Sequence, residues 1–184
     1  MTCIIALKHN KKVYMAGDSG AIGTNEWSVS PDPKVFVIDN EIAFGFTSSF
    51  RMGQVLQYKF TMPTRQRGDS DDKYIRVSVI DRIIEVFTEN KVITNVEGRP
   101  LECGTFLIGY RGEIYEVQDD MSVLRNALPY MSIGAGEDVA NGAMHVLCRD
   151  KKTIEPHAVL NQALQTVTEF CNSVRSPFHI VELK

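Results

Sequence analysis

The sequence lacks any apolar run long enough to cross a membrane. A bilayer-spanning helix needs about 20 consecutive apolar residues, and none of the hydrophobic runs in these 184 residues approaches that length. In the N-terminal segment MTCIIALKHNKK the basic residues follow a short apolar run, which is the reverse of a secretion signal. These absences argue against a membrane partner and against secretion, and they predict a cytoplasmic protein.

An excess of charge of one sign is also missing. The 20 Lys and Arg residues nearly balance the 23 Asp and Glu residues, and no run of Lys or Arg occurs. Surfaces that bind nucleic acid are strongly basic because they neutralise phosphates, so no nucleic-acid partner is expected. The four cysteines and four histidines are scattered and form no CxxC pair. The sequence therefore predicts neither a metal site nor another cofactor.

The composition is that of a globular protein with a core. Hydrophobic residues make up 43% of the chain and charged residues 23%, which are ordinary values for a globular protein. No linker, internal repeat or low-complexity segment interrupts it. We therefore expect a single domain that spans residues 1–184.

Strand and helix patterns arrive in blocks. Both faces of the first strand are apolar, which predicts cover on both sides, and the Gly, Ser and Pro content of residues 19–33 predicts a loop. After two hairpins the patterns predict helices over 48–60 and 73–89, and then a third hairpin with strands over 103–110 and 113–117 around Arg111-Gly112. A strand over 130–134, helices over 138–149 and from 156, and a strand over 178–183 follow. Blocks of this kind predict an α+β fold with antiparallel sheets and helices packed outside.

The first hairpin places a carboxylate beside the N-terminus. If its turn is centred between Asn10 and Lys11, the numbers of paired residues sum to about 21. Cys3 then faces Asp18, and Thr2 lies next to the Asp18 carboxylate at the end of the return strand.

The second hairpin places a lysine at a strand end. Its paired residue numbers sum to about 79, which puts Lys34 opposite Gly45. Asp18 and Lys34 then stand at the two strand ends that flank the 19–33 loop. Strand pairing alone does not say whether these two ends meet.

The residue types at these positions suggest nucleophilic chemistry. A Thr directly after the initiator Met becomes N-terminal when that Met is removed, and its α-amine can then act as a general base for its own hydroxyl. A nearby Lys would lower the pKa of that hydroxyl, and a carboxylate would orient the Lys. Thr2, Lys34 and Asp18 are therefore a candidate catalytic set.

Five segments resemble the proteasome β-subunit and HslV-like family of N-terminal nucleophile hydrolases. In chain order they are TCIIALKHNKKVYMAGDSGAIG, PKVFVI, IAFGFTSS, SIGAGEDVANGAMHVL and FCNSVRSPFHIVEL. The similarity extends over most of the chain, with the segments in the family's order. The resemblance implies a four-layer αββα sandwich of two antiparallel sheets flanked by helices, which agrees with the block order.

The resemblance also implies a role for each matching position. Thr2 would be the nucleophile and base, Asp18 the orienting carboxylate, and Lys34 the cation that tunes the site. The family's oxyanion donor is a backbone N–H in a Gly-Gly turn, and Ser48 stands at that position here. Because the donor is a backbone group, a Ser can still supply it, although Gly adopts the turn more freely.

Further positions would bind an extended substrate. Phe36 and Phe46 would line the pocket for the residue before the scissile bond, which implies a preference for apolar side chains. Ile22 would form main-chain hydrogen bonds with the substrate, with Ala21 and Thr47 beside it.

The accessory positions depart from the family pattern. The family has a Ser between two glycines before its next helix, where this chain has Ala135 followed by Gly136. The Asp expected near the end of the last long helix is Glu169, and the Ser three residues later is Asn172. Loss of accessory hydrogen bonds would slow such a site without abolishing it, because Thr, Asp and Lys remain.

Three functions remain open. The first is a threonine-type endopeptidase that hydrolyses peptide or protein substrates. The second is a catalytically inactive structural subunit, suggested by Ala135 and by Met1, which blocks the amine of Thr2 while it is attached. The third is a small-molecule amidase of the N-terminal nucleophile class. The resemblance further implies a homo-oligomeric double ring of six or seven subunits, an ATP-dependent unfoldase as partner, and maturation without a long propeptide.

Overall fold

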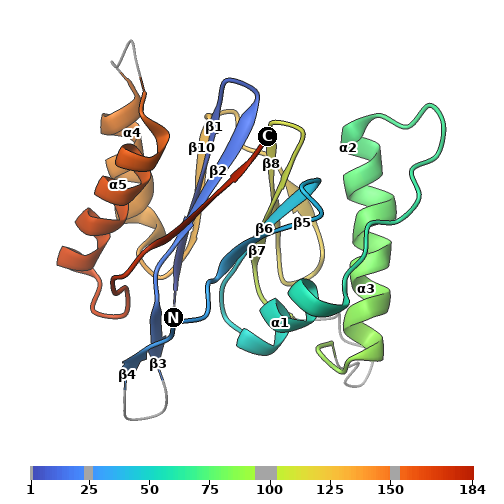
Figure 1. Ribbon diagram of the computed structural model, residues 1–184, viewed down its shortest axis with the longest axis horizontal. Coiled ribbons are helices and arrows are strands. Elements are labelled where there is room, and N and C mark those ends of the chain that lie inside the picture. The colour runs from blue at the N-terminus through green and yellow to red at the C-terminus, as the bar shows by residue number, and fades with distance from the viewer. Residues whose placement is uncertain (1, 23–26, 94–102, 150–153) are drawn as a thin grey trace.

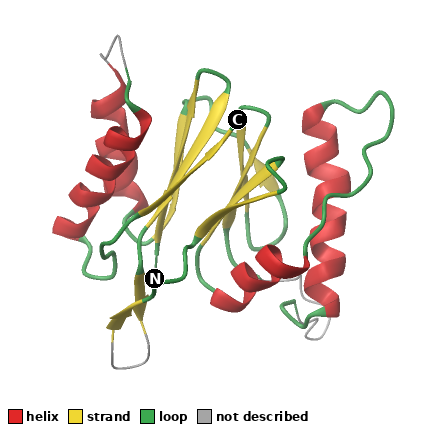
Figure 2. Cartoon of the chain, in the orientation of Figure 1, coloured by secondary structure: helices red, strands yellow, loops and turns green. Residues whose placement is uncertain are grey.

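Two sheets packed face to face form the middle of the molecule, and helices cover the outer face of each sheet (Figures 1 and 2). The computed structural model describes residues 2–22, 27–93, 103–149 and 154–184. The four layers follow the order helix, sheet, sheet, helix, and both large sheets are antiparallel. The αββα sandwich expected from the sequence is confirmed.

The first sheet carries the N-terminus. Its strand order is β10-β1-β2-β11, and helices α4 and α5 pack on its outer face. These elements are β1 (Cys3–His9), β2 (Lys12–Gly17), β10 (Tyr130–Gly134), β11 (His179–Leu183), α4 (Glu137–Arg149) and α5 (Pro156–Phe170). Ile5 and Leu7 of β1 pack toward the helices, while Ile4 and Ala6 pack between the sheets. The prediction that β1 is covered on both sides is therefore confirmed.

The second sheet lies against the first and has its own helices. Its strand order is β5-β6-β7-β8-β9. The elements of this half are β5 (Val35–Ile38), β6 (Ile42–Phe46), β7 (Phe106–Tyr110), β8 (Glu113–Val117), β9 (Val123–Leu124), α1 (Phe50–Lys59), α2 (Asp71–Lys73), the π-helical segment η1 (Tyr74–Val79) and α3 (Ile80–Glu89). The helix expected over 73–89 is thus continuous with α2 and has a π-helical middle. A large apolar cluster between α1, α3 and this sheet holds the layer in place.

The first hairpin has the predicted register. Asn10 and Lys11 both have positive φ, at 51° and 64°, as a two-residue type I′ turn requires. Ile4 pairs with Gly17, so the paired numbers sum to 21. Asp18 therefore lies at the strand end beside the N-terminus, as expected.

The second hairpin is shifted by one residue from the prediction. Val35 pairs with Gly45, and the N–H of Phe46 donates to the carbonyl of Lys34 at 3.1 Å. Lys34 therefore lies opposite Phe46, and its predicted pairing with Gly45 is wrong. The reason is that three residues, 39–41, separate the paired Ile38 and Ile42, whereas paired numbers that sum to 79 would leave only two residues in the turn.

The sequence patterns did not predict several short elements. The segment 19–33, expected to be a loop, contains a small hairpin of β3 (Gly20–Ile22) and β4 (Trp27–Val29). The two-residue strand β9 was also missed, because two or three residues are too few to show an alternating pattern. Helix α1 begins at Phe50 and not at residue 48, since the side chain of Ser49 caps it by accepting from the N–H of Met52 at 3.2 Å.

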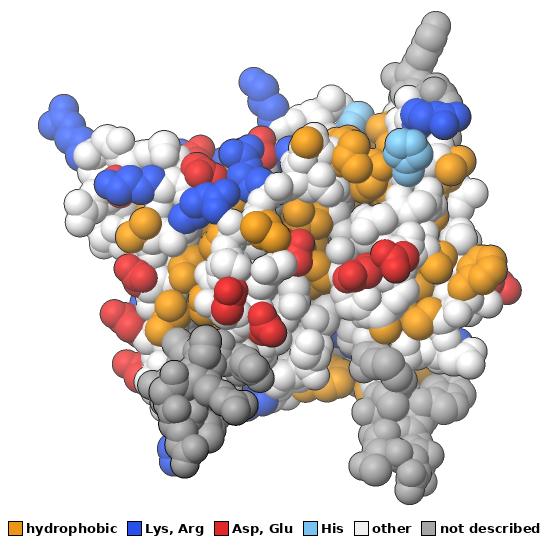
Figure 3. All heavy atoms as spheres, turned by 180° about the vertical axis from the view of Figure 1, so that it is seen from behind, with side chains coloured by type: hydrophobic (Ala, Val, Ile, Leu, Met, Phe, Trp, Pro, Cys, Tyr) orange, Lys and Arg blue, Asp and Glu red, His pale blue; other side chains and the backbone are white. Residues whose placement is uncertain are grey.

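The surface mixes charge of both signs with apolar side chains, as the face in Figure 3 shows. In the part of the chain that the structure describes, no helix has the length and apolar character needed to span a bilayer.

Candidate active site

An ion pair between two strand ends forms the centre of the candidate site. Asp18 directly follows β2, and Lys34 directly precedes β5. The Lys34 Nζ donates to Asp18 Oδ1 at 2.9 Å, and both side chains are 0% exposed. Lys34 Nζ also donates to the carbonyl of Gly20 at 2.5 Å. The two strand ends that pairing alone could not join therefore meet.

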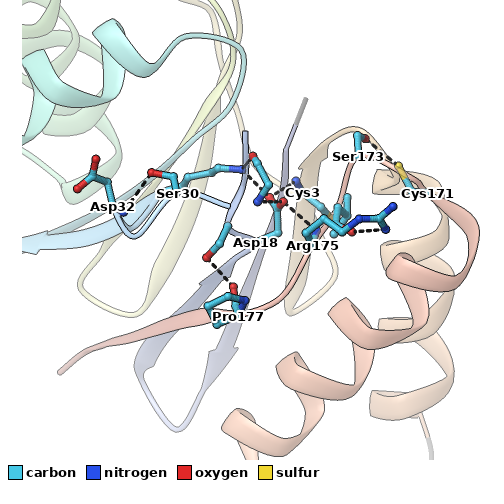
Figure 4. Close-up of polar contacts among 12 residues, drawn as sticks. Cys3, Asp18, Ser30, Asp32, Cys171, Ser173, Arg175 and Pro177 are labelled. Atoms are coloured by element: carbon cyan, nitrogen blue, oxygen red, sulfur yellow. Dashed lines mark hydrogen bonds and ion pairs between the residues drawn. The ribbon is translucent and has the colours of Figure 1, made fainter. Parts of the chain in front are cut away.

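The Asp18 carboxylate connects its own loop to two distant segments. Its Oδ1 accepts from the N–H of Cys3 at 3.1 Å, and its Oδ2 accepts from the N–H of Gly20 at 2.8 Å and of Arg175 at 3.2 Å. Figure 4 shows Asp18 next to Cys3 and Arg175. A buried carboxylate is tolerable only when its oxygens are satisfied in this way. Asp18 therefore fixes the start of β1 relative to the C-terminal segment.

The electrostatics of Lys34 differ from those of a surface lysine. Burial lowers the pKa of the ammonium, and the Asp18 carboxylate opposes that shift without cancelling it. Nζ also stands 5.9 Å from the centre of the Phe50 ring. Because the protein around Lys34 screens charge less than water does, its ammonium acts more strongly on neighbouring groups than that of a surface lysine.

Thr2 is held against this pair through its backbone. It is 6% exposed, and its carbonyl shares a peptide group with the Cys3 N–H that donates to Asp18. On the other side its carbonyl oxygen lies against Gly134, where a Cβ atom would overlap it. The structure thus brings Thr2 and Lys34 together through their shared contact with Asp18.

The turn after β6 presents an unused backbone donor. Ser48 has φ +69°, the left-handed region in which glycine is preferred. Thr47 anchors the turn, because its N–H and its hydroxyl both donate to the carbonyl of Thr105, at 3.1 and 2.9 Å. Within the described residues the N–H of Ser48 donates to no acceptor. A free N–H on an anchored turn is the kind of group that can stabilise an oxyanion.

A small cavity opens beside Phe46 and Phe50. It has a volume of about 90 Å³ and is lined by Asp32, Pro33, Phe46, Phe50, Gln54, Gln57 and Tyr58. Phe46 and Phe50 form an edge-to-face pair with ring centres 6.1 Å apart. Phe50, one of the lining residues, also lies near the Lys34 ammonium, with 5.9 Å between Nζ and the ring centre.

The other predicted substrate-binding residues lie in different places. Phe36 is 6% exposed in the outer core, where it packs on Phe44 and Phe46, and it is not among the residues that line the cavity. Ala21 lies in β3 opposite Ser28, and Ile22 ends that strand. Thr47 is buried in the turn described above.

The accessory positions are not all brought to the site. Ala135 and Gly136 form the turn between β10 and α4, close to the start of β1. Glu169 and Asn172 are exposed near the end of α5. No hydrogen bond joins either of them to Asp18 or Lys34 among the described residues.

Residues that the sequence reasoning missed occupy this region. Ser173 is 5% exposed, its Oγ lies 3.1 Å from Cys171 Sγ, and its carbonyl oxygen would stand 2.6 Å from a Cβ placed on Gly20. Arg175 supplies the backbone N–H to Asp18. The segment SVRSP has no periodic pattern, and although it lies within one of the segments that resemble the family, nothing in it marked Ser173 or Arg175 as part of the site.

Cys3 is not a competing nucleophile. Its thiol is fully buried, and burial, followed by the Asp18 carboxylate, raises the pKa of the thiol to about 12. The reactive form of cysteine is the thiolate, which is scarce at neutral pH when the pKa is this high. Over the described ranges of the chain, no group of three or more His, Cys, Asp and Glu residues could hold a metal ion.

Known structures share this architecture. The BPH of Thiobacillus denitrificans, solved in complex with epoxomicin, superposes with a TM-score of 0.79 at 15% identity over 100% of this chain and 98% of that one. HslV from Trypanosoma brucei gives a TM-score of 0.71 at 17% identity, over 100% and 99% of the two chains. Anbu from Yersinia bercovieri gives 0.68 at 14% identity, over 98% and 81%. At these identities the likeness shows the fold.

The family is shown by the sequence itself. No curated protein matches the chain. The family described as "Proteasome subunit", however, matches residues 1–182, nearly the whole sequence. The chain therefore belongs to the proteasome subunit family.

Proposed function

We propose that this chain is a threonine-type peptidase in which Thr2 is the nucleophile. The observation that carries the proposal is the fully buried Asp18–Lys34 ion pair, hydrogen-bonded to the N–H of the residue after Thr2. Burying a lysine is costly, so its position here needs an explanation. Chemistry explains a lysine beside a candidate N-terminal hydroxyl, because its positive charge lowers the pKa of that hydroxyl.

The proposed reaction begins with removal of Met1, which lies outside the described residues. The free α-amine of Thr2 takes the proton of its own hydroxyl, and Oγ attacks the substrate carbonyl. Lys34 favours the developing alkoxide, and Asp18 keeps Lys34 in place. The N–H of Ser48 donates a hydrogen bond to the carbonyl oxygen, on which negative charge develops.

The second half of the reaction releases the products. The tetrahedral intermediate collapses, the C–N bond breaks, and the departing amine takes the proton held by the Thr2 amine. An ester between Oγ and the substrate acyl group remains. Water, deprotonated by the same α-amine, then attacks this ester and regenerates the Thr2 hydroxyl.

The cavity of Phe46 and Phe50 would hold the substrate side chain before the scissile bond. Two aromatic rings favour an apolar side chain, while Asp32 and Gln54 give the wall a polar portion. We expect an apolar preference in short peptide substrates. Backbone groups of Ala21 and Ile22 in β3 would pair with the extended substrate.

The ring assembly and the delivery of substrates to its interior are expected from the family. A homo-oligomeric double ring of six or seven subunits would enclose the sites, and an ATP-dependent unfoldase would deliver protein substrates. Native mass spectrometry of the purified protein would determine the ring size. A monomer at micromolar concentration would contradict the ring.

A covalent labelling experiment tests the peptidase directly. A peptide epoxyketone reacts with both the amine and the hydroxyl of an N-terminal Thr, so we expect an adduct on Thr2 in protein whose intact mass lacks Met1. Thr2→Ser, which keeps the hydroxyl, should still form the adduct. Thr2→Val, which keeps the shape but has no hydroxyl, should not.

The same experiment separates the alternatives. An assembled protein that retains Met1 and takes no label would favour the inactive ring subunit. Protein that lacks Met1, takes no peptide label and yet hydrolyses simple amides would favour the small-molecule amidase.

A further inference from the structure

Gly134 is the point at which two parts of the candidate site touch. It ends β10 opposite Cys3 and has φ +93°. A Cβ atom at this position would overlap the carbonyl oxygen of Thr2 and would stand 2.9 Å from Cγ2 of Thr47. The backbone of Gly134 therefore separates Thr2 from the turn that carries the Ser48 N–H.

The side chain of Glu137 holds Gly134. The N–H of Gly134 donates to Glu137 Oε2 at 3.0 Å. The carbonyl of Glu137 in turn accepts from the hydroxyl of Ser132 at 3.0 Å. A Glu that reaches back to an N–H three residues earlier resembles the return half of a capping box, and a carboxylate is favoured in the first turn of a helix. Glu137 is thus fixed to β10 at both its backbone and its side chain.

No other side chain in this turn can perform the same task. The turn consists of Gly134, Ala135, Gly136 and Glu137, and only the last has a polar side chain. The charge of Glu137 also reaches the N-terminal segment, since burial, Asp18, Cys171 and Glu137 together raise the pKa of the Cys3 thiol.

We propose that Glu137 is a positioning residue for Thr2, acting through the hydrogen bond that fixes Gly134. The proposal rests on the proposed function, because it assigns Glu137 to the same site. Glu137 touches neither the nucleophile nor the substrate. It sets the distance between the Thr2 backbone and the oxyanion turn, and a misplacement of about 1 Å in such a site can cost about a hundredfold in rate.

The effect is expected in turnover and not in substrate binding. Glu137 is exposed, so water can replace its carboxylate on the Gly134 N–H, and the fold survives its loss. The cavity of Phe46 and Phe50 is built from other elements and keeps its shape. Loss of Glu137 should therefore lower kcat and leave KM nearly unchanged.

Three variants test the proposal in the assembled protein lacking Met1, with a fluorogenic peptide as substrate. Glu137→Ala should lower kcat about tenfold or more, with KM changed by less than about twofold. Glu137→Gln should keep kcat within about threefold of wild type, because its amide oxygen still accepts from Gly134. Asp138→Ala removes the neighbouring exposed carboxylate of α4 and should leave both constants unchanged.

Unchanged kcat in Glu137→Ala would overturn the proposal. So would a Gln variant as slow as the Ala variant, because charge and not the hydrogen bond would then matter, or an equal loss in Asp138→Ala.

Amide hydrogen exchange at Gly134 provides a readout that does not need activity. Exchange should be faster in Glu137→Ala than in wild type and unchanged in Glu137→Gln. If the wild type proves inactive while exchange follows this pattern, the positioning contact stands and the peptidase proposal fails. If exchange is the same in all variants, the positioning proposal fails whatever the activity.

Discussion

The Asp18 carboxylate and the Lys34 ammonium form a 2.9 Å ion pair in which neither side chain is exposed. Taking two charges out of water is costly, and their mutual attraction repays this only when further hydrogen bonds satisfy both groups. Lys34 has the Gly20 carbonyl as a second acceptor, and Asp18 has the N–H groups of Cys3, Gly20 and Arg175. The pair is therefore part of the structure of the fold as well as of the proposed chemistry.

Asp18→Ala should destabilise the protein more than Lys34→Met does. The first change leaves a buried ammonium and three N–H groups without their acceptor, so the free energy of unfolding should fall by about 3–5 kcal/mol. After the second, Asp18 still accepts from those three N–H groups. Urea unfolding followed by circular dichroism measures both, and a larger loss in Lys34→Met would contradict this account of the pair.

Gly134→Ala and Gly142→Ala should have opposite effects on stability. At position 134 the new Cβ would overlap the Thr2 carbonyl at a positive φ, so we expect a loss of more than about 2 kcal/mol. At position 142, inside α4, a Cβ meets nothing within 4 Å, and the helix should gain about 0.5–1 kcal/mol. Thermal or urea unfolding decides the matter, and a harmless Gly134→Ala would refute the close approach of Thr2.

Because Ser48 has a positive φ, we expect replacement of this residue by glycine to cost no stability. Ser at φ +69° carries a cost of about 1–2 kcal/mol that Gly avoids, although the greater freedom of Gly in the unfolded chain offsets part of the gain. Ser48→Gly should therefore be neutral or stabilising and should retain epoxyketone labelling, since the N–H remains.

Ser48→Val is the matched comparison for that variant. A β-branched side chain is poorly accommodated at positive φ, so this variant should lose stability and label more slowly. If Ser48→Gly and Ser48→Val had the same stability and labelled at the same rate, the positive φ at position 48 would not contribute to stability.

The Cys3 thiol predicts a specific dependence of stability on pH. Its pKa is about 12 in the fold against an ordinary value of 9.0, so between about pH 9 and pH 12 the folded state binds more protons than the unfolded state. Stability from this group is therefore complete below about pH 9 and is lost as the pH rises toward 12. Burial lowers the pKa of Lys34 below its ordinary value of 10.5. The contribution of Lys34 to stability therefore rises, and does not fall, as the pH increases toward that value.

Comparison with Cys3→Ala isolates this effect, because the other titrating groups are common to both proteins. The stability gap between wild type and Cys3→Ala, measured by urea unfolding, should be smaller at pH 10.5 than at pH 8. A gap that does not change with pH would show that the thiol is not protected by burial.

Much of the fold followed from local patterns. The type I′ turn at Asn10 and Lys11 set the first hairpin, and apolar residues on both faces of residues 3–8 indicated a strand between two layers. The second register was missed by one residue, since the composition of a turn does not reveal whether its loop holds two residues or three. The β3–β4 hairpin was missed because its strands are too short for any periodicity.

The sequence by itself determined the blocks of strands and helices, the presence of Thr, Asp and Lys near strand ends, and the family. These follow from hydrophobic periodicity and turn chemistry, which act between neighbours in the chain. Only the tertiary structure decided that Asp18 meets Lys34, that Arg175, 157 residues away, donates to the same carboxylate, and that Glu137 holds the glycine beside Thr2. Such contacts arise when sheet packing brings remote segments together, and no local pattern in the chain records them.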